Sequence, residues 1–297
     1  PGVFNVPNTE LLPYACFGVL IAGLMYVILA ACFKIFGMKK VMRFFPPIVV
    51  GPIIICIGLT LSSSAINNCN TNWLIALLAI AVVIICNIWG KGMIKIIPIL
   101  IGVLTSYVVS MIVDPASRAV VVQKVSEAAW IGLPVHKEAT VFGLLSGNFD
   151  SGMLVTACVT IVPLAIATMM EHVGDICAIS STVGKNFVED PGLHRTLVGD
   201  GLATTMASLF GAPANTTYGE NTGVLALSKV YDPKVIRLAA VFAIVLSFCP
   251  KFSALIVAMP AATMGGVSLV LYGMISAVGV RNVVENQVDF TKSRNVL

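Results

Sequence analysis

Four carboxylates lie in apolar or small-residue segments, where a charged group needs a specific role. Glu171 and Asp175 occur together in the segment TMMEHVGDICAIS. Their spacing puts both side chains on one face of a helix, about one turn apart. Two carboxylates that close in a low dielectric do not both ionise easily, so one of them is expected to hold a proton. A carboxylate that gains and loses a proton is what a proton-coupled carrier requires. The alternative is that this segment is a helix end near the membrane interface, where both charges are solvated.

The other two acids are flanked by glycines. Asp200 lies in LVGDGLATTM and Glu220 in TTYGENTG, directly before the apolar run VLALS. A half-helix that starts at Glu220 would direct its unpaired N–H groups into a cavity, which is where transporters place substrates. Glu220 as a simple helix cap is the alternative, although Ser, Thr, Asn or Asp would be commoner there. Asp200 either faces another helix through small residues or marks an interfacial helix start, because Arg195 lies close by.

The bulk composition is that of a membrane protein. Hydrophobic residues make up 58% of the chain and charged residues only 11%, whereas soluble domains have about 25% charged residues. The net charge of +4 is small, so we expect no nucleic-acid partner. The eight cysteines are scattered singly and the three histidines are not spaced as ligands of one ion. No metal and no cofactor are therefore expected, and the chain is not expected to be an enzyme.

Apolar runs mark the candidate membrane spans. A helix needs about 20 apolar residues to cross about 30 Å of hydrocarbon. The stretch 196–230 is too long for one span and is interrupted by AlaProAlaAsn at 212–215 and by Gly219. A helix, a short irregular segment and a half-helix fit it better. The predicted spans are 13–33, 46–66, 73–90, 93–113, 152–176, 196–212, 220–230, 235–258 and 261–280.

Basic residues fall mainly in alternate loops, as expected when they mark the cytoplasmic side. This alternation holds only if 196–212 and 220–230 are separate passes. The long loop 114–151 is then expected on the outer face as a short amphipathic or extended segment. The basic residues of the alternate loops are Lys34, Lys39, Lys40 and Arg43; Lys91 and Lys95; Lys185 and Arg195; Lys229, Lys234 and Arg237; and Arg281, Lys292 and Arg294.

A sequence motif begins at Glu220. Glu220-Asn221-Thr222-Gly223, followed by Ser228 and Lys229, resembles the signature of the nucleobase–ascorbate transporter family, also called nucleobase:cation symporter type 2. That signature has Gln, Glu or Pro, then Asn-x-Gly, and after four residues Thr followed by Arg, Lys or Gly, so Ser228 is a mild departure. Four segments resemble the bacterial uracil-transporting members in order and spacing: EHVGD (171–175), EDPGLHRTLVGDG (189–201), PANTTYGENTG (213–223) and MGGVSLVLYGMI (264–275).

The resemblance covers essentially the whole chain and implies a fold. It implies an all-α polytopic membrane protein of 14 spans in two inverted seven-span repeats, with a core and a gate domain. The half-helix 220–230 would follow a short strand near 215–219. The chain would be a fragment that holds the fourth to twelfth spans and lacks spans at both ends. The implied domains are core at 1–40, gate at 41–150, core at 151–258 and the start of a second gate segment at 259–297.

The resemblance also implies which residues bind the substrate. Glu171 and Glu220 match the two carboxylates that hold the uracil ring through its N–H groups and the neighbouring carbonyl. Gly219 and Tyr218 match backbone contacts beside the ring. The motif residues Asn221, Gly223, Ser228 and Lys229 would support this site.

A proton-linked network is implied as well. Glu171, Asp175, Asp200 and Tyr272 would form it, with the proton as the coupling ion. Asp175 stands where a well-described uracil carrier has histidine, which leaves the detailed proton path open. Asp200 matches an acid common in purine-transporting members, whereas Glu at the first signature position favours uracil.

The function that the resemblance implies is proton-coupled uracil import by alternating access, in the bacterial cytoplasmic (inner) membrane. Its partners would be uracil or a related nucleobase and the lipid bilayer, and the family allows a homodimer. A xanthine or urate permease of the same family is the nearest alternative. An anion exchanger of the same architecture is a further one, although Glu220 argues against an anion site. A membrane aspartyl protease is disfavoured because position 197 is Leu where its GxGD motif has Gly.

Overall fold

The computed structural model describes residues 9–41, 43, 46–135, 137–145 and 150–296. The regular secondary structure of this part of the chain is all helical, with no strand, which confirms the prediction of an all-α protein. The chain forms two compact units, residues 1–50 with 135–222 and residues 51–134 with 223–297. Compact units do not by themselves show which parts move, so the assignment of core and gate domains stays a prediction.

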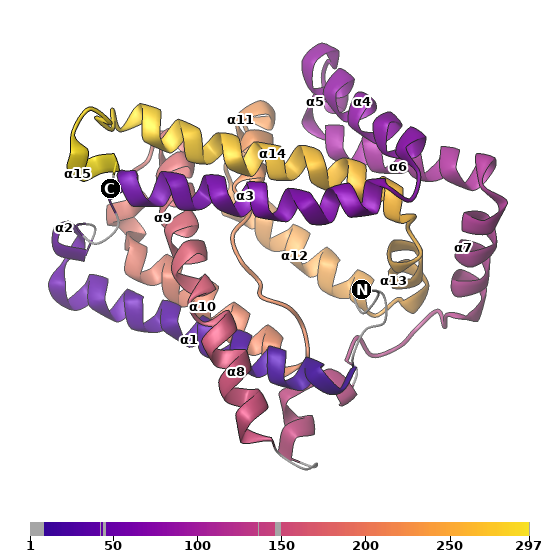
Figure 1. Cartoon of the computed structure of the whole chain (residues 1–297), viewed down its shortest axis with the longest axis horizontal. Helices are drawn as coiled ribbons and strands as arrows, with labels where there is room; N and C mark the ends of the chain where they lie inside the picture. The colour runs from indigo at the N-terminus through magenta and orange to yellow at the C-terminus, as the bar shows by residue number, and fades with distance from the viewer. Residues whose placement is uncertain (1–8, 42, 44–45, 136, 146–149, 297) are drawn as a thin grey trace. The chain divides into compact units, whose positions relative to one another are not determined.

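The first unit is built on four long helices, of which α1 runs beside α10 and α8 leads into α9 (Figure 1). Shorter elements connect these helices, and α11 begins where the sequence of the first unit ends. The long helices are α1 (Leu12–Phe36), α8 (Ser151–Ile161), α9 (Leu164–Val183) and α10 (Leu193–Leu209). The shorter elements are η2 (Thr9–Leu11), α2 (Met38–Val41), η4 (Lys137–Ala139), η5 (Val141–Leu145) and η6 (Val188–Gly192). Helix α11 (Glu220–Ser228) begins in this unit, and its residues from Gly223 on are assigned to the second.

The core of the first unit lies where α1, α9 and α10 meet. Its residues recur at helical spacing, for example Tyr26 and Ala30 on α1 and Met169 and Val173 on α9, and Leu197 of α10 completes the cluster. Residues three or four apart share one helix face, so each helix contributes one buried stripe. This stripe fixes the rotation of α9 and thereby the direction of the polar side chains next to it.

Two glycines bring α1 and α10 into backbone contact. A Cβ on Gly201 would lie 2.6 Å from both the Gly23 carbonyl oxygen and the Tyr26 Cβ. A Cβ on Gly23 would lie 2.8 Å from the Gly201 carbonyl oxygen. Small residues allow such close crossings of membrane helices. Asp200 is therefore carried on a helix that packs through small residues, as the sequence predicts.

The second unit contains the remaining helices, with α3 and α14 side by side (Figure 1). Glycines on α14 allow close packing on both α3 and α4. A Cβ on Gly279 would lie 2.7 Å from the Gly51 carbonyl oxygen of α3, and one on Gly266 would overlap the Ala76 carbonyl oxygen of α4. The helices are α3 (Pro47–Cys69), α4 (Trp73–Trp89), α5 (Met93–Ile96), α6 (Pro98–Val113), α7 (Pro115–Glu127), α12 (Pro233–Ser247), α13 (Pro250–Val257), α14 (Ala261–Glu285) and α15 (Ser293–Val296).

Two helix pairs of this unit are sharply bent. The angle is 110° between α6 and α7 and 92° between α12 and α13. Pro115 and Pro250 each begin the second helix, and the residue before a proline avoids helical backbone angles. The predicted span 235–258 is therefore not one straight helix, because it bends before Pro250. The loop 114–151 contains a 13-residue helix, α7, that mean apolarity did not reveal.

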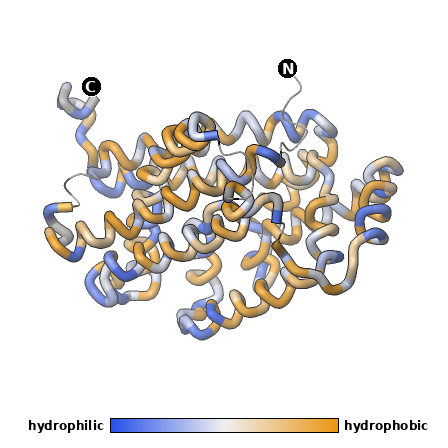
Figure 2. Tube along the Cα trace, turned by 90° about the horizontal axis from the view of Figure 1, so that it is seen from below, coloured by the Kyte–Doolittle hydropathy of each residue, from blue (hydrophilic) through white to orange (hydrophobic). Residues whose placement is uncertain are grey.

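Four described helical segments are long and apolar enough to cross a membrane, or up to six if each bent pair is one span. Figure 2 shows hydrophobic residues along most of the helices and hydrophilic ones at many turns. Multi-pass membrane character is therefore supported by the helices as well as by composition. The four segments are Leu12–Phe36, Pro47–Cys69, Ser151–Val183 and Ala261–Glu285.

Candidate functional site

A non-helical crossing segment separates α10 from α11. Helix α10 ends at Leu209 and α11 begins at Glu220, so the predicted break is confirmed. Residues 212–218 have neither helix nor strand structure. A strand is defined by its hydrogen-bonded partner, and no strand pairing occurs in the described chain, so the strand near 215–219 stays a prediction.

Three residues of this segment contact the helices of the first unit. The Asn215 carbonyl accepts a 3.1 Å hydrogen bond from the Thr204 hydroxyl of α10. The Thr217 side chain reaches α9 and α10, and Gly219 lies against Asp175 of α9. The crossing segment is thus fixed to the helices at three points.

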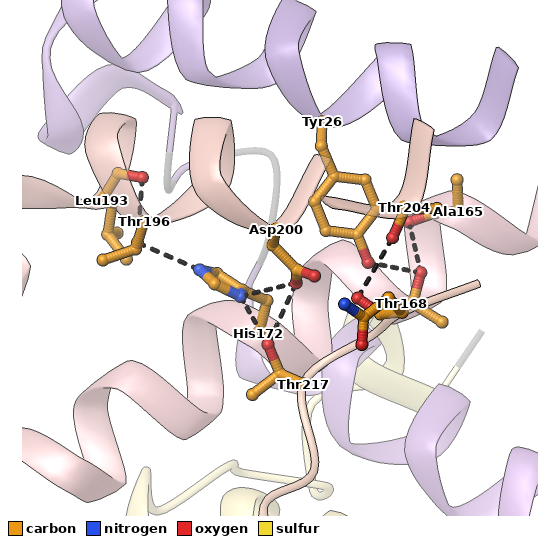
Figure 3. Close-up of polar contacts among 10 residues, drawn as sticks. Tyr26, Ala165, Thr168, His172, Leu193, Thr196, Asp200, Thr204 and Thr217 are labelled. Carbon is orange, nitrogen blue, oxygen red and sulfur yellow. Dashed lines mark hydrogen bonds and ion pairs between the residues drawn. The ribbon is translucent and has the colours of Figure 1, made fainter. Parts of the chain in front are cut away.

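His172 of α9 is the centre of these contacts. Its Nδ1 lies 3.0 Å from Asp200 Oδ2 and 2.8 Å from Thr217 Oγ1, and its Nε2 lies 3.0 Å from Thr196 Oγ1. Figure 3 shows the imidazole between the three side chains. The ring is only 3% exposed. It joins α9, α10 and the crossing segment in a single polar cluster.

Asp200 closes this cluster from α10. Its Oδ2 accepts a 3.0 Å hydrogen bond from the Thr217 hydroxyl and faces His172 Nδ1. A carboxylate with about a tenth of its surface exposed is costly unless donors compensate for the lost water. The hydroxyl and the imidazole N–H supply that compensation. Asp200 thereby has a structural role in holding the crossing segment.

Tyr26 of α1 encloses the other side of the imidazole. Its ring meets that of His172 edge-on, with centroids 6.4 Å apart. Its hydroxyl donates a 2.7 Å hydrogen bond to Thr168 Oγ1, one helical turn before His172 on α9 (Figure 3). This apolar ring face helps to exclude water from the cluster, and the hydroxyl ties α1 to α9.

Gly219 and Asp175 are so close that no side chain fits between them. A Cβ on Gly219 would overlap Asp175 Oδ1 and lie 3.0 Å from the carboxyl carbon. Asp175 is buried, with 6% of its surface exposed. The crossing segment therefore delivers its last residue, and the N-terminus of α11 that follows, to a buried carboxyl group on α9.

Comparison with known proteins identifies the family. A family model described as "Permease family" matches residues 6–297. The chain belongs to this family of transporters. The match covers the sequences of both compact units.

Several curated relatives of the permease are bacterial. It is 38% identical over 296 residues to "Uracil permease" of Bacillus subtilis (strain 168), which covers 95% of this chain and 66% of the relative. It is 37% identical over 288 residues to "Probable uracil permease" of Haemophilus influenzae, covering 94% and 66%. It is 35% identical over 291 residues to "Uracil permease" of Escherichia coli (strain K12), covering 94% and 64%. The chain thus spans about two thirds of the length of these relatives.

The structure of the permease brings several predicted site residues together. Glu171 and Asp175 lie on α9, where Glu171 is half-buried, and Gly219 lies beside Asp175. Glu220 is the first residue of α11, and its side chain lies outside the described residues. Tyr218 is 63% exposed in the first unit, so its side chain is free for a further contact. The substrate-binding roles of these residues stay predictions.

The motif residues shape α11. Lys229 ends the helix in a left-handed conformation (φ 56°), and its N–H donates to the Leu225 carbonyl at 2.9 Å. The Ser228 hydroxyl donates to the same carbonyl at 3.4 Å. Asn221 and Gly223 lie within the helix. Their supporting role for a bound substrate is untested by these contacts.

Tyr272 belongs to the second unit, whereas the polar cluster around His172 belongs to the first. It lies on α14 in the second unit, where a Cβ on Gly58 of α3 would come 2.5 Å from its carbonyl oxygen. Its proposed part in a proton-linked network with Glu171 therefore stays a prediction. Among the described residues, His, Cys, Asp and Glu form no group of three that could hold a metal ion.

Sequence reasoning missed His172, Thr196 and Thr217. The sequence assigned His172 no role, yet it lies three residues before Asp175 and three after the buried Met169. That spacing puts it beside both on the helix surface. A histidine on a buried face needs hydrogen-bond partners for two ring nitrogens. Nearby threonines could have been considered as those partners.

Proposed function

We propose that the permease imports uracil together with a proton across the bacterial cytoplasmic membrane by alternating access, with no further cofactor. The observation that carries this proposal is the crossing segment, which brings the N-terminus of α11 to Asp175 on α9. Helix N-termini at such breaks present unpaired N–H groups and a positive dipole end to a polar ligand. The names of the relatives supply the ligand class.

A binding site with two carboxylates suits uracil better than a site with cationic side chains. It is a neutral ring whose edge offers N–H donors and carbonyl acceptors. In this proposal Glu171 and Glu220 accept from the ring N–H groups, while backbone groups at Tyr218 and Gly219 meet its polar edge. A few well-placed polar groups of this kind are what orient a small ligand in a binding site.

The coupling proton is assigned to the acids of α9. Glu171 and Asp175 lie about one helical turn apart, so a proton on one relieves the repulsion of the other. In this proposal protonation of Glu171 favours uracil binding and biases the equilibrium between outward-open and inward-open states. Asp200 and Tyr272 complete the network.

A xanthine or urate permease is the second candidate, since Asp200 resembles an acid of purine-transporting members. The contacts of Asp200 weaken that indication. Its carboxylate already accepts from Thr217 and faces His172, so its presence has a structural reason that is independent of the substrate. An anion exchanger is a weaker candidate because acids, rather than bases, surround the start of α11.

The proposal extends to the whole architecture. It includes fourteen spans in two inverted repeats, a core domain that carries the substrate, a gate domain, and assembly as a homodimer. Within the proposed gate segments 41–150 and 259–297, glycines allow α14 to pack closely on α3 and α4.

Transport by the full-length protein in proteoliposomes tests the proposal. Radiolabelled uracil should accumulate when the outside is more acidic than the inside, and a protonophore should abolish accumulation. Excess unlabelled uracil should compete, whereas xanthine and urate should not. Accumulation without any pH gradient would overturn proton coupling, and competition by xanthine or urate alone would assign a purine substrate.

A further inference from the structure

The buried imidazole of His172 uses both ring nitrogens, although no carboxylate assigned to the substrate touches it in these contacts. We propose that His172 is a positioning residue whose Nδ1–H anchors the crossing segment, residues 212–219, through Thr217. It thereby sets the place of Gly219 and of the α11 N-terminus. The inference rests on the proposed function in one respect, because it names the residue that positions the proposed substrate site. The anchoring itself is testable without any substrate.

Hydrogen counting assigns a proton to Nδ1. The Thr217 hydroxyl has one hydrogen, which it donates to Asp200 Oδ2 at 3.0 Å. Its oxygen is then an acceptor for Nδ1, 2.8 Å away. The Asp200 oxygen lies 3.0 Å from the same nitrogen. If Nδ1 carried no hydrogen, its lone pair would face this carboxylate oxygen directly, which is repulsive. The Nδ1–H therefore serves Thr217 and Asp200 together.

Thr196 holds this arrangement from the other side of the ring. Its hydroxyl lies 3.0 Å from Nε2 and 3.1 Å from the Leu193 carbonyl oxygen. When the hydroxyl donates to Nε2, the ring is neutral and its hydrogen must be on Nδ1. When the hydroxyl turns to Leu193, Nε2 carries a hydrogen and the ring is charged. Both states keep the Nδ1–H on Thr217, so the anchor survives either one.

The position of the anchor explains why it matters for the site. Thr217 lies between the bond from Thr204 to Asn215 and the contact of Gly219 with Asp175. Without it, the segment loses the contact that lies between these two points. Because Gly219 packs tightly against Asp175, a displacement of the backbone at Thr217 also displaces Gly219 and the first residue of α11.

Two substitutions separate the roles of the two ring nitrogens, because each new side chain resembles one part of the imidazole. His172→Asn keeps an N–H₂ donor near the Nδ1 position and loses the contact with Thr196. His172→Gln carries its amide nitrogen near the Nε2 position and loses the donor to Thr217. Both variants are short, polar and neutral. A general requirement for a polar side chain would treat them alike, whereas the anchor requires Asn and not Gln.

Hydrogen exchange of the full-length protein in nanodiscs, without substrate, is the first test. In peptides covering 212–225, His172→Gln should exchange about tenfold faster than wild type, as expected for losing one buried bond to a charged group. His172→Asn should stay within about threefold of wild type. Thr217→Val leaves the imidazole in place but removes both the acceptor for Nδ1 and the donor to Asp200, so exchange should be at least as fast as in His172→Gln.

Thr182→Val is the matched control. It removes a part-buried hydroxyl bond on the same helix, which runs to the Ala178 carbonyl of α9 itself and not to the crossing segment. Exchange in 212–225 should be unchanged in this variant. Equal exchange rates in His172→Asn and His172→Gln, or no response to Thr217→Val, would overturn the anchor. Faster exchange spread over α1 and α10 as well would mean a core role instead, and would also overturn it.

Uracil affinity is the second test. His172→Gln should weaken binding by about tenfold and His172→Asn by no more than about threefold, because only the former frees the start of α11. Wild-type protein that exchanges as expected but does not bind uracil would refute the proposed substrate and leave the anchor standing. Normal uracil binding by both His172 variants would refute the positioning role alone.

Discussion

A methyl group on Gly219 would occupy space that belongs to the Asp175 carboxylate. This close approach fixes where the chain crosses from the extended segment into α11. Glycine is required here by a neighbouring side chain and not by a left-handed backbone, since Gly219 is not among the positive-φ residues of the described chain.

Gly219→Ala should therefore displace the start of α11. Inserting a methyl group into a close-packed site costs about 1–3 kcal/mol, so we expect uracil affinity to fall about tenfold or more. Gly199→Ala on α10 is the control, because a Cβ there meets nothing within 4 Å. Equilibrium binding of labelled uracil to the purified protein measures both. Equal affinities for the two variants would contradict the role of this contact.

Glu220→Gln should weaken uracil binding by about tenfold to a hundredfold. In the proposed function the Glu220 carboxylate accepts from ring N–H groups, and an amide that replaces one acceptor by a donor leaves a buried polar mismatch of about 1–3 kcal/mol. The exposed Glu189 offers a matched control, since Glu189→Gln makes the same chemical change in η6. Binding of the Glu220→Gln variant with wild-type affinity would exclude this role.

Gly201→Ala should destabilise the first unit. Its new methyl group would lie 2.6 Å from the Gly23 carbonyl oxygen and the Tyr26 Cβ, so α1 and α10 must separate. We expect a loss of about 1–3 kcal/mol, seen as a lower midpoint of thermal unfolding in detergent. Gly199→Ala, two residues earlier on the same helix, should leave the midpoint unchanged or raise it slightly, because alanine favours helix. A lower midpoint for Gly199→Ala alone would contradict this packing.

Tyr107→Phe should loosen the contact between α6 and α13. The Tyr107 hydroxyl donates a 2.9 Å hydrogen bond to the Leu255 carbonyl oxygen, and the ring is buried. Removing the donor costs about 1 kcal/mol and leaves a carbonyl unsatisfied. Faster proteolysis in the α12–α13 region is the expected readout, compared with Tyr231→Phe at an exposed position. Identical proteolysis of both variants would show that this bond is not limiting.

The membrane class, the all-helical fold and the break between α10 and α11 follow from sequence alone. Mean apolarity predicts membrane helices because the hydrocarbon admits little else. Proline and polar residues at 212–215, together with the alternation of basic loops, indicated the break, and α10 and α11 lie on either side of it. These are local signals that survive whatever the helices pack against.

The bends before Pro115 and Pro250 show where local signals were insufficient. Both prolines were visible, but a proline either kinks a span or starts a new helix, depending on what surrounds it. Here Tyr107 and Lys251 provide the contacts that hold the bent pairs, through the Leu255 and Val125 carbonyls. These partners lie more than a hundred residues away in sequence.

The sequence by itself determined which residues are chemically costly in a membrane: Glu171, Asp175, Asp200 and Glu220. It could not pair them with their partners. Only the tertiary structure placed Asp200 and Thr217 on the two sides of one His172 nitrogen, and Gly219 against Asp175. The reason is physical. Burial cost is a property of one side chain and its segment, whereas a hydrogen bond depends on the relative rotation of two helices, which packing at Gly23 and Gly201 decides.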